Sequence, residues 1–188
     1  GIEARTTGIM HEFARSEDRI AVGQIQGLGF ALLAVAGILL AIFGWPRLAA
    51  VALLPNALPV LIAFGAMGLM GVALDAGTVF VGNLALGIAI DDTIHETAEF
   101  FRRRALGQEP ELALRGALAR MLRPVVYTTL IVTAGFAVLG LSSFTFTRNL
   151  GLLTAGVMVL CLLADLLLLP ALLLRLEARK ELVSAEVV

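Results

Sequence analysis

The 188-residue sequence contains a single cysteine, few charged residues and no excess of either charge sign. Cys161 cannot form an internal disulfide, and no Cys or His spacing typical of a metal site is present. Charged residues make up 15% of the chain, against about 25% in ordinary soluble domains. A formal net charge of −1 argues against a nucleic-acid partner. No nucleophile–base pair is visible, so we expect neither enzymatic activity nor a bound cofactor.

What the sequence has instead is long apolar runs. Hydrophobic residues account for 59% of the chain, against roughly 45–50% in soluble domains. A helix that crosses a bilayer needs about 20 apolar residues. The runs therefore predict an all-α integral membrane bundle of five transmembrane helices, at about residues 25–44, 48–72, 78–101, 125–141 and 150–174.

Three charged segments lie outside these runs. Residues 1–24 hold seven charges and suit either an interfacial amphipathic helix at the end of an extracytoplasmic region or a frayed polar end. They begin with glycine rather than methionine and show no signal-peptide pattern, so we expect the chain to begin inside a larger protein. Residues 102–123 hold six arginines, and Glu111–Leu122 predicts an amphipathic helix lying flat on the membrane, unless this segment is a solvated loop. Residues 175–188 predict a partly disordered tail.

The basic residues indicate an orientation. Ten of the fourteen Lys and Arg residues lie on the side of Arg47, Arg102–Arg123 and the tail, and four lie on the other side. Cytoplasmic loops carry the excess of positive charge. We therefore expect a multi-pass membrane protein with an extracytoplasmic N-terminus and a cytoplasmic C-terminus.

The third apolar run carries polar residues at helical spacing. One stripe recurs every four residues, at Asn83, Gly87, Asp91 and His95. A second stripe, about 100° round the helix, carries acids at Asp92, Glu96 and Glu99.

Two adjacent carboxylates in a membrane span need a function, because each charge in hydrocarbon costs roughly 3 kcal/mol. Burial and a neighbouring carboxylate both favour the protonated form, so Asp91 and Asp92 could take and release one proton. We expect both to point into the bundle toward the fourth helix, with Gly87 leaving room for a facing helix. Glu96 and Glu99 suit hydrated interfacial residues. His95 suits either a relay member or an interfacial residue.

Other polar residues are further candidates. Thr128 and Thr129 lie at a depth comparable with Asp91 and could donate to its carboxylate, or bond to their own backbone. Asp165 suits either a second buried acid or a charge that pairs with Arg175 at the end of its helix. Asn56, between two prolines, is interpreted as part of a structural kink.

Several motifs occur together in a characteristic order. They are Leu54-Pro55-Asn56-x-x-Pro59, Gly87-x-x-x-Asp91-Asp92, Arg123-Pro124-x-x-x-Thr128-Thr129, Gly135-Phe136-x-x-Leu139, Ser142-Ser143-Phe144 and Asp165-x-x-x-x-Pro170. In this order they resemble the resistance-nodulation-division (RND) superfamily. The most similar branch is the MMPL and hopanoid-exporter group, which is related to Patched and sterol-sensing domains.

The resemblance implies a function and partners. It implies that the chain is the last five spans of the second half of a proton-driven exporter in a bacterial cytoplasmic membrane. The exporter would move lipids or other hydrophobic molecules, with protons as the coupling ion. Asp91 and Asp92 match the proton-relay position. Many relatives have Asp-Tyr there, so the resemblance leaves open which of the two carboxylates titrates. Implied partners are membrane lipids, an N-terminal half and an extracytoplasmic porter domain, and a homo-oligomer is left open. Alternatives are a sterol-sensing-like lipid-binding regulatory module and a protein-translocation accessory.

Overall fold

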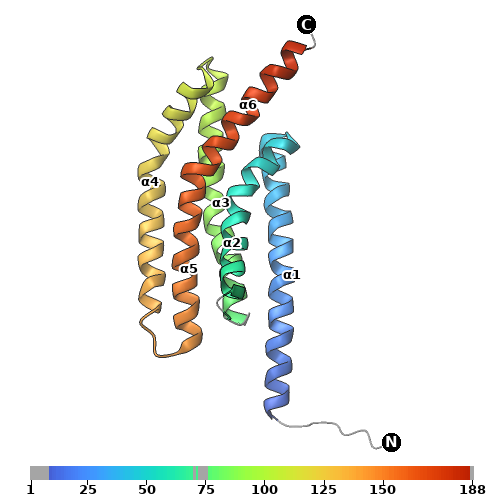
Figure 1. The fold of residues 1–188 in the computed structure, drawn as a ribbon, viewed down its shortest axis with the longest axis vertical. Helices are drawn as coiled ribbons and strands as arrows, with labels where there is room; N and C mark the ends of the chain where they lie inside the picture. Colours follow the sequence, from blue (N-terminus) through green and yellow to red (C-terminus); the bar gives the residue numbers. More distant parts are fainter. Residues whose placement is uncertain (1–8, 70, 72–75, 187–188) are drawn as a thin grey trace, which may run out of the picture.

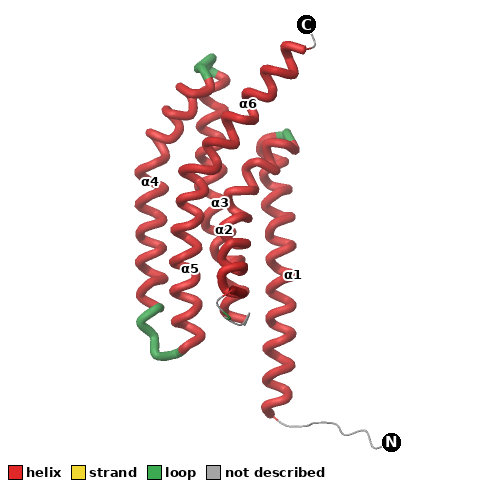
Figure 2. The backbone as a smooth tube through the Cα atoms, viewed as in Figure 1, coloured by secondary structure: helices red, strands yellow, loops and turns green. Residues whose placement is uncertain are grey.

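The computed structural model describes residues 9–69, 71 and 76–186, and all regular elements among them are helices. They are α1 (Ile9–Phe43), α2 (Pro46–Leu69), α3 (Ala76–Ala105), α4 (Pro110–Leu139), α5 (Thr145–Leu163), the π-helical turn η1 (Ala164–Leu168) and α6 (Leu169–Glu186). The last three follow one another without a break and form one long rod (Figures 1 and 2). The five helical segments run in alternating directions, and this arrangement confirms the predicted all-α bundle.

Four stretches in the described part of the chain are long and apolar enough to cross a membrane: Ile25–Phe43, Pro46–Leu69, Pro110–Leu139 and Thr145–Ala178. The helix α3 is not among them because it carries the charged residues, yet at 30 residues it has a length of about 45 Å. Large apolar side chains such as Phe30, Leu61 and Ile131 are exposed on the outside of the bundle. An apolar exterior of this kind suits contact with lipid.

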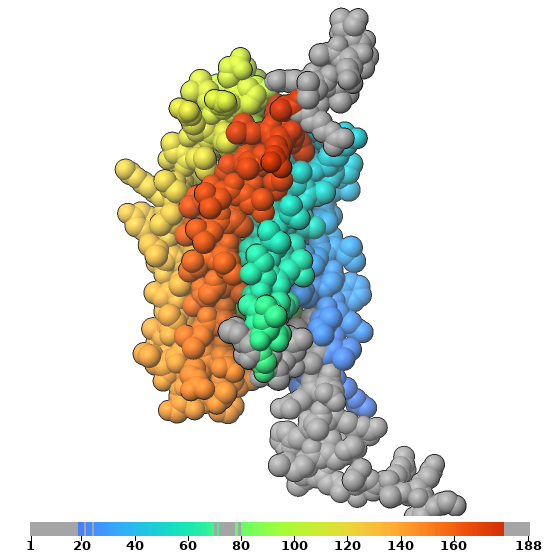
Figure 3. All heavy atoms as spheres, viewed as in Figure 1, coloured from blue at the N-terminus to red at the C-terminus, as the bar shows by residue number. Residues whose placement is uncertain are grey.

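The helix α3 forms the centre of the bundle. It contacts α1, α2, α4 and α5, and on the face shown in Figure 3 it is largely covered by α2, α5 and α6. One apolar cluster joins α3 to α2 and α5 through Ala85, Val60 and Val157. A second cluster, around Phe100, joins α3 to α4 and α6 near the α3–α4 connection. Side chains on the inner faces of α3 are therefore held by packing on several sides.

Three helical segments differ from the sequence-based expectation. The tail predicted to be partly disordered is helical as far as Glu186, because α6 continues through it. The N-terminal segment is continuous with the first span, since α1 runs unbroken from Ile9 to Phe43. Residues 111–122 are helical but are not separate from the fourth span, because both belong to α4. Their apolar residues Ala113, Leu114 and Ala117 pack against Phe100, Leu169 and Leu173. Most of the connection between the second and third predicted spans, at residues 73–77, lies outside the described residues.

Prolines and the π-helical turn coincide with changes of direction. The helix α4 contains Pro124, and its first part is inclined to the remainder in Figure 1. α6 is likewise inclined to α5, and η1 lies between them. Proline removes a backbone donor and displaces the carbonyl four residues earlier. Pro55 and Pro59 both lie inside α2, at the place where the sequence predicts a kink.

The hairpin of α4 and α5 depends on Gly151. A Cβ atom at this position would lie 2.5 Å from the carbonyl oxygen of Phe136 and 2.6 Å from Cβ of Leu139. Both are atoms of α4 that cannot move without shifting the helix. At Gly156, further along α5, a Cβ atom would meet nothing within 4 Å. Gly151 therefore permits the closest approach of the two helices.

We predict that Gly151→Ala destabilises the bundle, although alanine is ordinarily preferred to glycine in a helix by about 1 kcal/mol. Overpacking of this kind costs about 1–3 kcal/mol. The matched control Gly156→Ala should be neutral or stabilising. Thermal unfolding of the purified variants in detergent measures both effects, and equal stabilities would contradict the close approach.

Candidate functional site

The two adjacent aspartates of α3 point in different directions. Asp91 and His95 are largely exposed, with side-chain exposures of 74% and 64%, and His95 Nε2 lies 3.4 Å from Asp91 Oδ1. Gly87, one turn earlier, is also exposed, and a Cβ atom there would meet nothing within 4 Å. We call Gly87, Asp91 and His95 the outer stripe. Asp92 is half-buried on the inner side of α3.

The outer stripe faces outward between α1 and α4. Ile90 packs on the cluster shared by α1 and α2, whereas Asp92 faces α4 and α5. Asp91 lies between these two directions. The expectation that both carboxylates point into the bundle therefore holds for Asp92 and is wrong for Asp91. Within the described part of this chain, Gly87 has no helix facing it, and Asn83 is half-buried near Gly27 of α1.

Asp92 borders a small, partly open cavity of about 20 Å³ between the helices. Its lining comes from α3, α4, α5 and η1: Ile88, Ala89, Asp92, Thr128, Thr129, Met158, Cys161, Leu162 and Asp165. About 10–15 Å³ of such space suffices for one water molecule, provided that polar partners are present. The cavity thus brings Asp92, Thr129 and Asp165 around a space of one-water size. We call it the Asp92 cavity.

The two threonines of α4 behave differently. The Thr128 hydroxyl donates to backbone carbonyls of its own helix, with oxygen–oxygen distances of 3.0 Å to both Pro124 and Val125. Of the two interpretations given above, Thr128 therefore follows the second, a hydrogen bond to its own backbone. Thr129 is buried and lies on the wall of the Asp92 cavity. Among the candidates on α4, it is Thr129 that faces the inner carboxylates.

Asp165 is the second buried acid, and it is held by a chain of hydrogen bonds across three helices. The Thr93 hydroxyl donates to Asp165 Oδ1 at 2.8 Å, and Asn56 Nδ2 donates to the Thr93 hydroxyl oxygen at 2.8 Å. Asn56 Nδ2 also lies 3.1 Å from the carbonyl oxygen of Ala52. Asn56 and Thr93 are 0% exposed and Asp165 is 2% exposed. We call Asn56, Thr93 and Asp165 the buried polar chain.

The π-helical turn explains how Asp165 reaches α3. The N–H of Leu169 donates to the carbonyl of Ala164, five residues earlier. Pro170 follows directly, and its ring would displace the carbonyl of Leu166, which favours a wider turn just before it. π-Helical turns are rare and often occur at functional sites. Asp165 therefore belongs to the buried centre of the bundle rather than to an ion pair at the end of its helix.

A cluster of arginines closes the bundle at the α3–α4 connection. Glu99 accepts hydrogen bonds from Arg102 at 2.7 and 2.8 Å and from Arg103 at 2.9 Å. Arg120 of α4 lies 3.9 Å from the same carboxylate. The hydrogen bonds to Glu99 raise the pKa of Arg102 above its ordinary value, so Arg102 stays charged. We call these four residues the arginine cluster.

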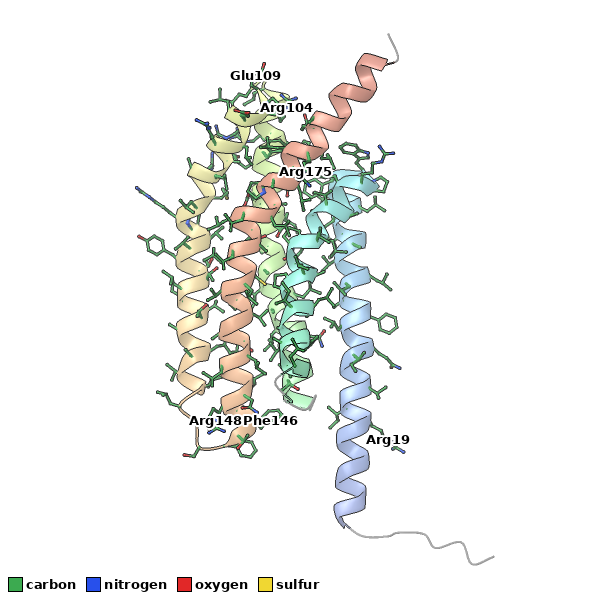
Figure 4. The ribbon with its side chains drawn as sticks, in the orientation of Figure 1. Arg19, Arg104, Glu109, Phe146, Arg148 and Arg175 are labelled. Atoms are coloured by element: carbon green, nitrogen blue, oxygen red, sulfur yellow. The ribbon has the colours of Figure 1, made fainter. Side chains whose placement is uncertain are left out.

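A second ion pair ties α3 to α6 at the same end. Arg104 Nη2 lies 2.8 Å from Glu177 Oε2. Figure 4 shows Arg104, Glu109 and Arg175 near this end, and Arg148 and Arg19 near the other. This ion pair therefore joins α3 and α6 at the end of the bundle that is cytoplasmic in the predicted orientation.

Sequence reasoning missed four members of the site. It interprets Glu96 and Glu99 as hydrated interfacial acids, and both are buried, with exposures of 2% and 7%. It assigns Asn56 to a kink alone and does not single out Thr93. The available signal was polarity at Asn56, which interrupts an apolar run, because a buried polar group needs a partner. Thr93 gave no such signal, since it directly follows Asp91 and Asp92 in a polar stretch.

Comparison with known proteins agrees with this architecture. The MMPL family model matches residues 1–186. The chain is 30% identical over 172 residues to the "Putative membrane protein MJ1562" of Methanocaldococcus jannaschii, covering 92% of this chain and 44% of that protein. The chain thus spans less than half the length of this curated relative. The match over nearly all of the sequence shows that the chain belongs to the MMPL family.

Proposed function

We propose that this chain is the membrane domain of a proton-driven RND-type exporter of lipids or other hydrophobic molecules. The observation that carries the proposal is the Asp92 cavity, in which Asp92 and Asp165 face a space of one-water size inside a bundle with an apolar exterior. Ionisable groups inside membrane domains commonly belong to proton or ion pathways. Two carboxyl groups beside one water suit the uptake and release of a proton.

The outer stripe supports a further part of the proposal. Asp91 and His95 are exposed in the middle of a helix that lies between apolar neighbours. Exposure of such groups to hydrocarbon is costly. A second set of helices, with polar groups of its own, would cover the outer stripe in the complete protein. This role fits the N-terminal half that the family resemblance implies.

The proposed cycle couples protonation to packing. A proton that enters from the extracytoplasmic side neutralises the carboxyl groups around the Asp92 cavity, and neutral groups let α3, α4 and η1 pack closely. Release of the proton toward the cytoplasm restores the charge and draws water back. Repeated repacking of α3 against its neighbours would move the attached extracytoplasmic domain. The orientation follows the arginine-rich α3–α4 connection, which belongs on the cytoplasmic side.

Transport in vesicles tests the proposal. The full-length protein that contains this chain is reconstituted, and the movement of a fluorescent phospholipid is followed while a pH gradient is imposed. We expect movement that stops when an ionophore collapses the gradient. Movement that continues unchanged after the collapse would contradict proton coupling.

A further inference from the structure

Glu96 is a buried acid that the proposed cycle does not yet use. It is 2% exposed on the inner side of α3, and its Oε1 atom has no hydrogen-bond partner. Asp92 lies one turn earlier on the same side of α3, and Asp165 is hydrogen-bonded to Thr93, three positions before Glu96. A buried charge that serves structure alone is normally paired with an opposite charge. Glu96 is instead placed beside two other acids.

The position of Glu96 lies between the two polar regions of the site. It lies four positions after Asp92, a rise of about 6 Å along the helix, and three positions before Glu99, a rise of about 4.5 Å. Residues at both spacings share one face of a helix. Thr93 and Thr97 line the same buried side, each with 0% exposure. A carboxyl group at Glu96 therefore divides the path from the Asp92 cavity to Glu99 into two short steps.

Beyond Glu99 the path reaches solvent. Glu99 is bonded to Arg102 and lies near Arg120, whose side chains are 52% and 61% exposed. The arginine cluster is therefore a polar region that joins the interior of the bundle to its surface. The apolar cluster around Phe100 packs at the same level of α3.

We propose that Glu96 is the carboxyl group through which protons pass between the Asp92 cavity and the arginine cluster. In this step a proton leaves the carboxyl group of Asp92 or Asp165, crosses through a water molecule and binds to the Glu96 carboxylate. Glu96 then releases it to water at the arginine cluster and returns to its charged form. No electron transfer or covalent bond other than O–H is involved. The inference rests on the proposed proton coupling and assigns its cytoplasmic step.

Proton movement in vesicles tests the assignment. The full-length protein is reconstituted around an encapsulated pH-sensitive dye, and proton entry is recorded after an external pH jump. Glu96→Gln and Glu96→Leu should slow proton movement by about 100-fold, the size of effect expected when a proton-transferring group is removed. Glu96→Asp should retain movement with an altered pH profile. Glu111→Gln, which removes an exposed carboxylate at the same end of the bundle, should match the wild type.

Chemical rescue separates proton transfer from a structural role. Glu96→Ala should regain proton movement when formate is added, because formate is a carboxylate that can take up and release a proton. Formamide has a similar size but cannot do so, and it should have no effect. Size-exclusion profiles show whether each variant is folded. Wild-type rates in Glu96→Gln, or equal responses to formate and formamide, would overturn the inference. If Asp92→Asn also moves protons normally, the proposed function itself fails; if it is inactive while Glu96→Gln is normal, only the role of Glu96 fails.

Discussion

Asp92→Asn is expected to abolish proton-coupled export while leaving membrane insertion intact. Asparagine keeps the size of aspartate and can still hydrogen-bond to a water in the Asp92 cavity, but it cannot exchange a proton. Loss of a proton-transferring group lowers rates by about 100-fold or more. Proton movement into dye-loaded vesicles and export of a fluorescent phospholipid measure the loss. Membrane insertion is checked by labelling of single cysteines at the two ends of the bundle.

We expect the same loss for Asp91→Asn, for a different reason. Asp91 is 74% exposed in this chain and lies 3.4 Å from His95. Under the proposed function, its role depends on further helices that we propose cover the outer stripe. Glu111→Gln serves as the matched control because its carboxylate is exposed and remote from both faces of the site. Normal export by both aspartate variants would refute the proposed function.

Much of the fold followed from hydrophobic runs, because a membrane span must be both apolar and helical. The continuity of helices was harder to predict. The sequence places Pro124 between an interfacial helix and the fourth span, yet α4 continues through it. Proline deprives the carbonyl of Arg120 of its helical partner, and Arg120 is exposed, so water can satisfy that carbonyl. Sequence alone does not reveal this local solvation.

The site was only partly predictable for a related reason. Helical periodicity separated Asp91 from Asp92 and placed Asp92, Glu96 and Glu99 on one stripe. It could not decide which stripe faces inward, because both carry polar groups. The buried polar chain joins residues that are 37 and 72 positions apart. Such contacts depend on the register between helices, and in the case of Asp165 also on the π-helical turn.

The buried polar chain allows structure and proton transfer to be separated at one position. In Asp165→Asn the side-chain oxygen can still accept the hydrogen bond from Thr93, which spans 2.8 Å in the native chain. Stability should therefore change by less than about 1 kcal/mol. Proton movement should nevertheless fall by about 100-fold, because the amide cannot take up a proton.

Thr93→Val should give the reverse result. Valine has nearly the same shape but lacks the hydroxyl group, so Asp165 Oδ1 loses its donor while Asn56 Nδ2 keeps only the carbonyl of Ala52. Leaving buried polar groups without partners costs about 1–3 kcal/mol. Thermal unfolding in detergent should show this loss, and proton movement should persist at temperatures where the variant stays folded, since its carboxyl groups are all present. For Asp165→Asn, the contradicting result would be proton movement at the wild-type rate. Asp165 would then be a structural acid, and Asp92 and Glu96 would have to transfer the proton without it.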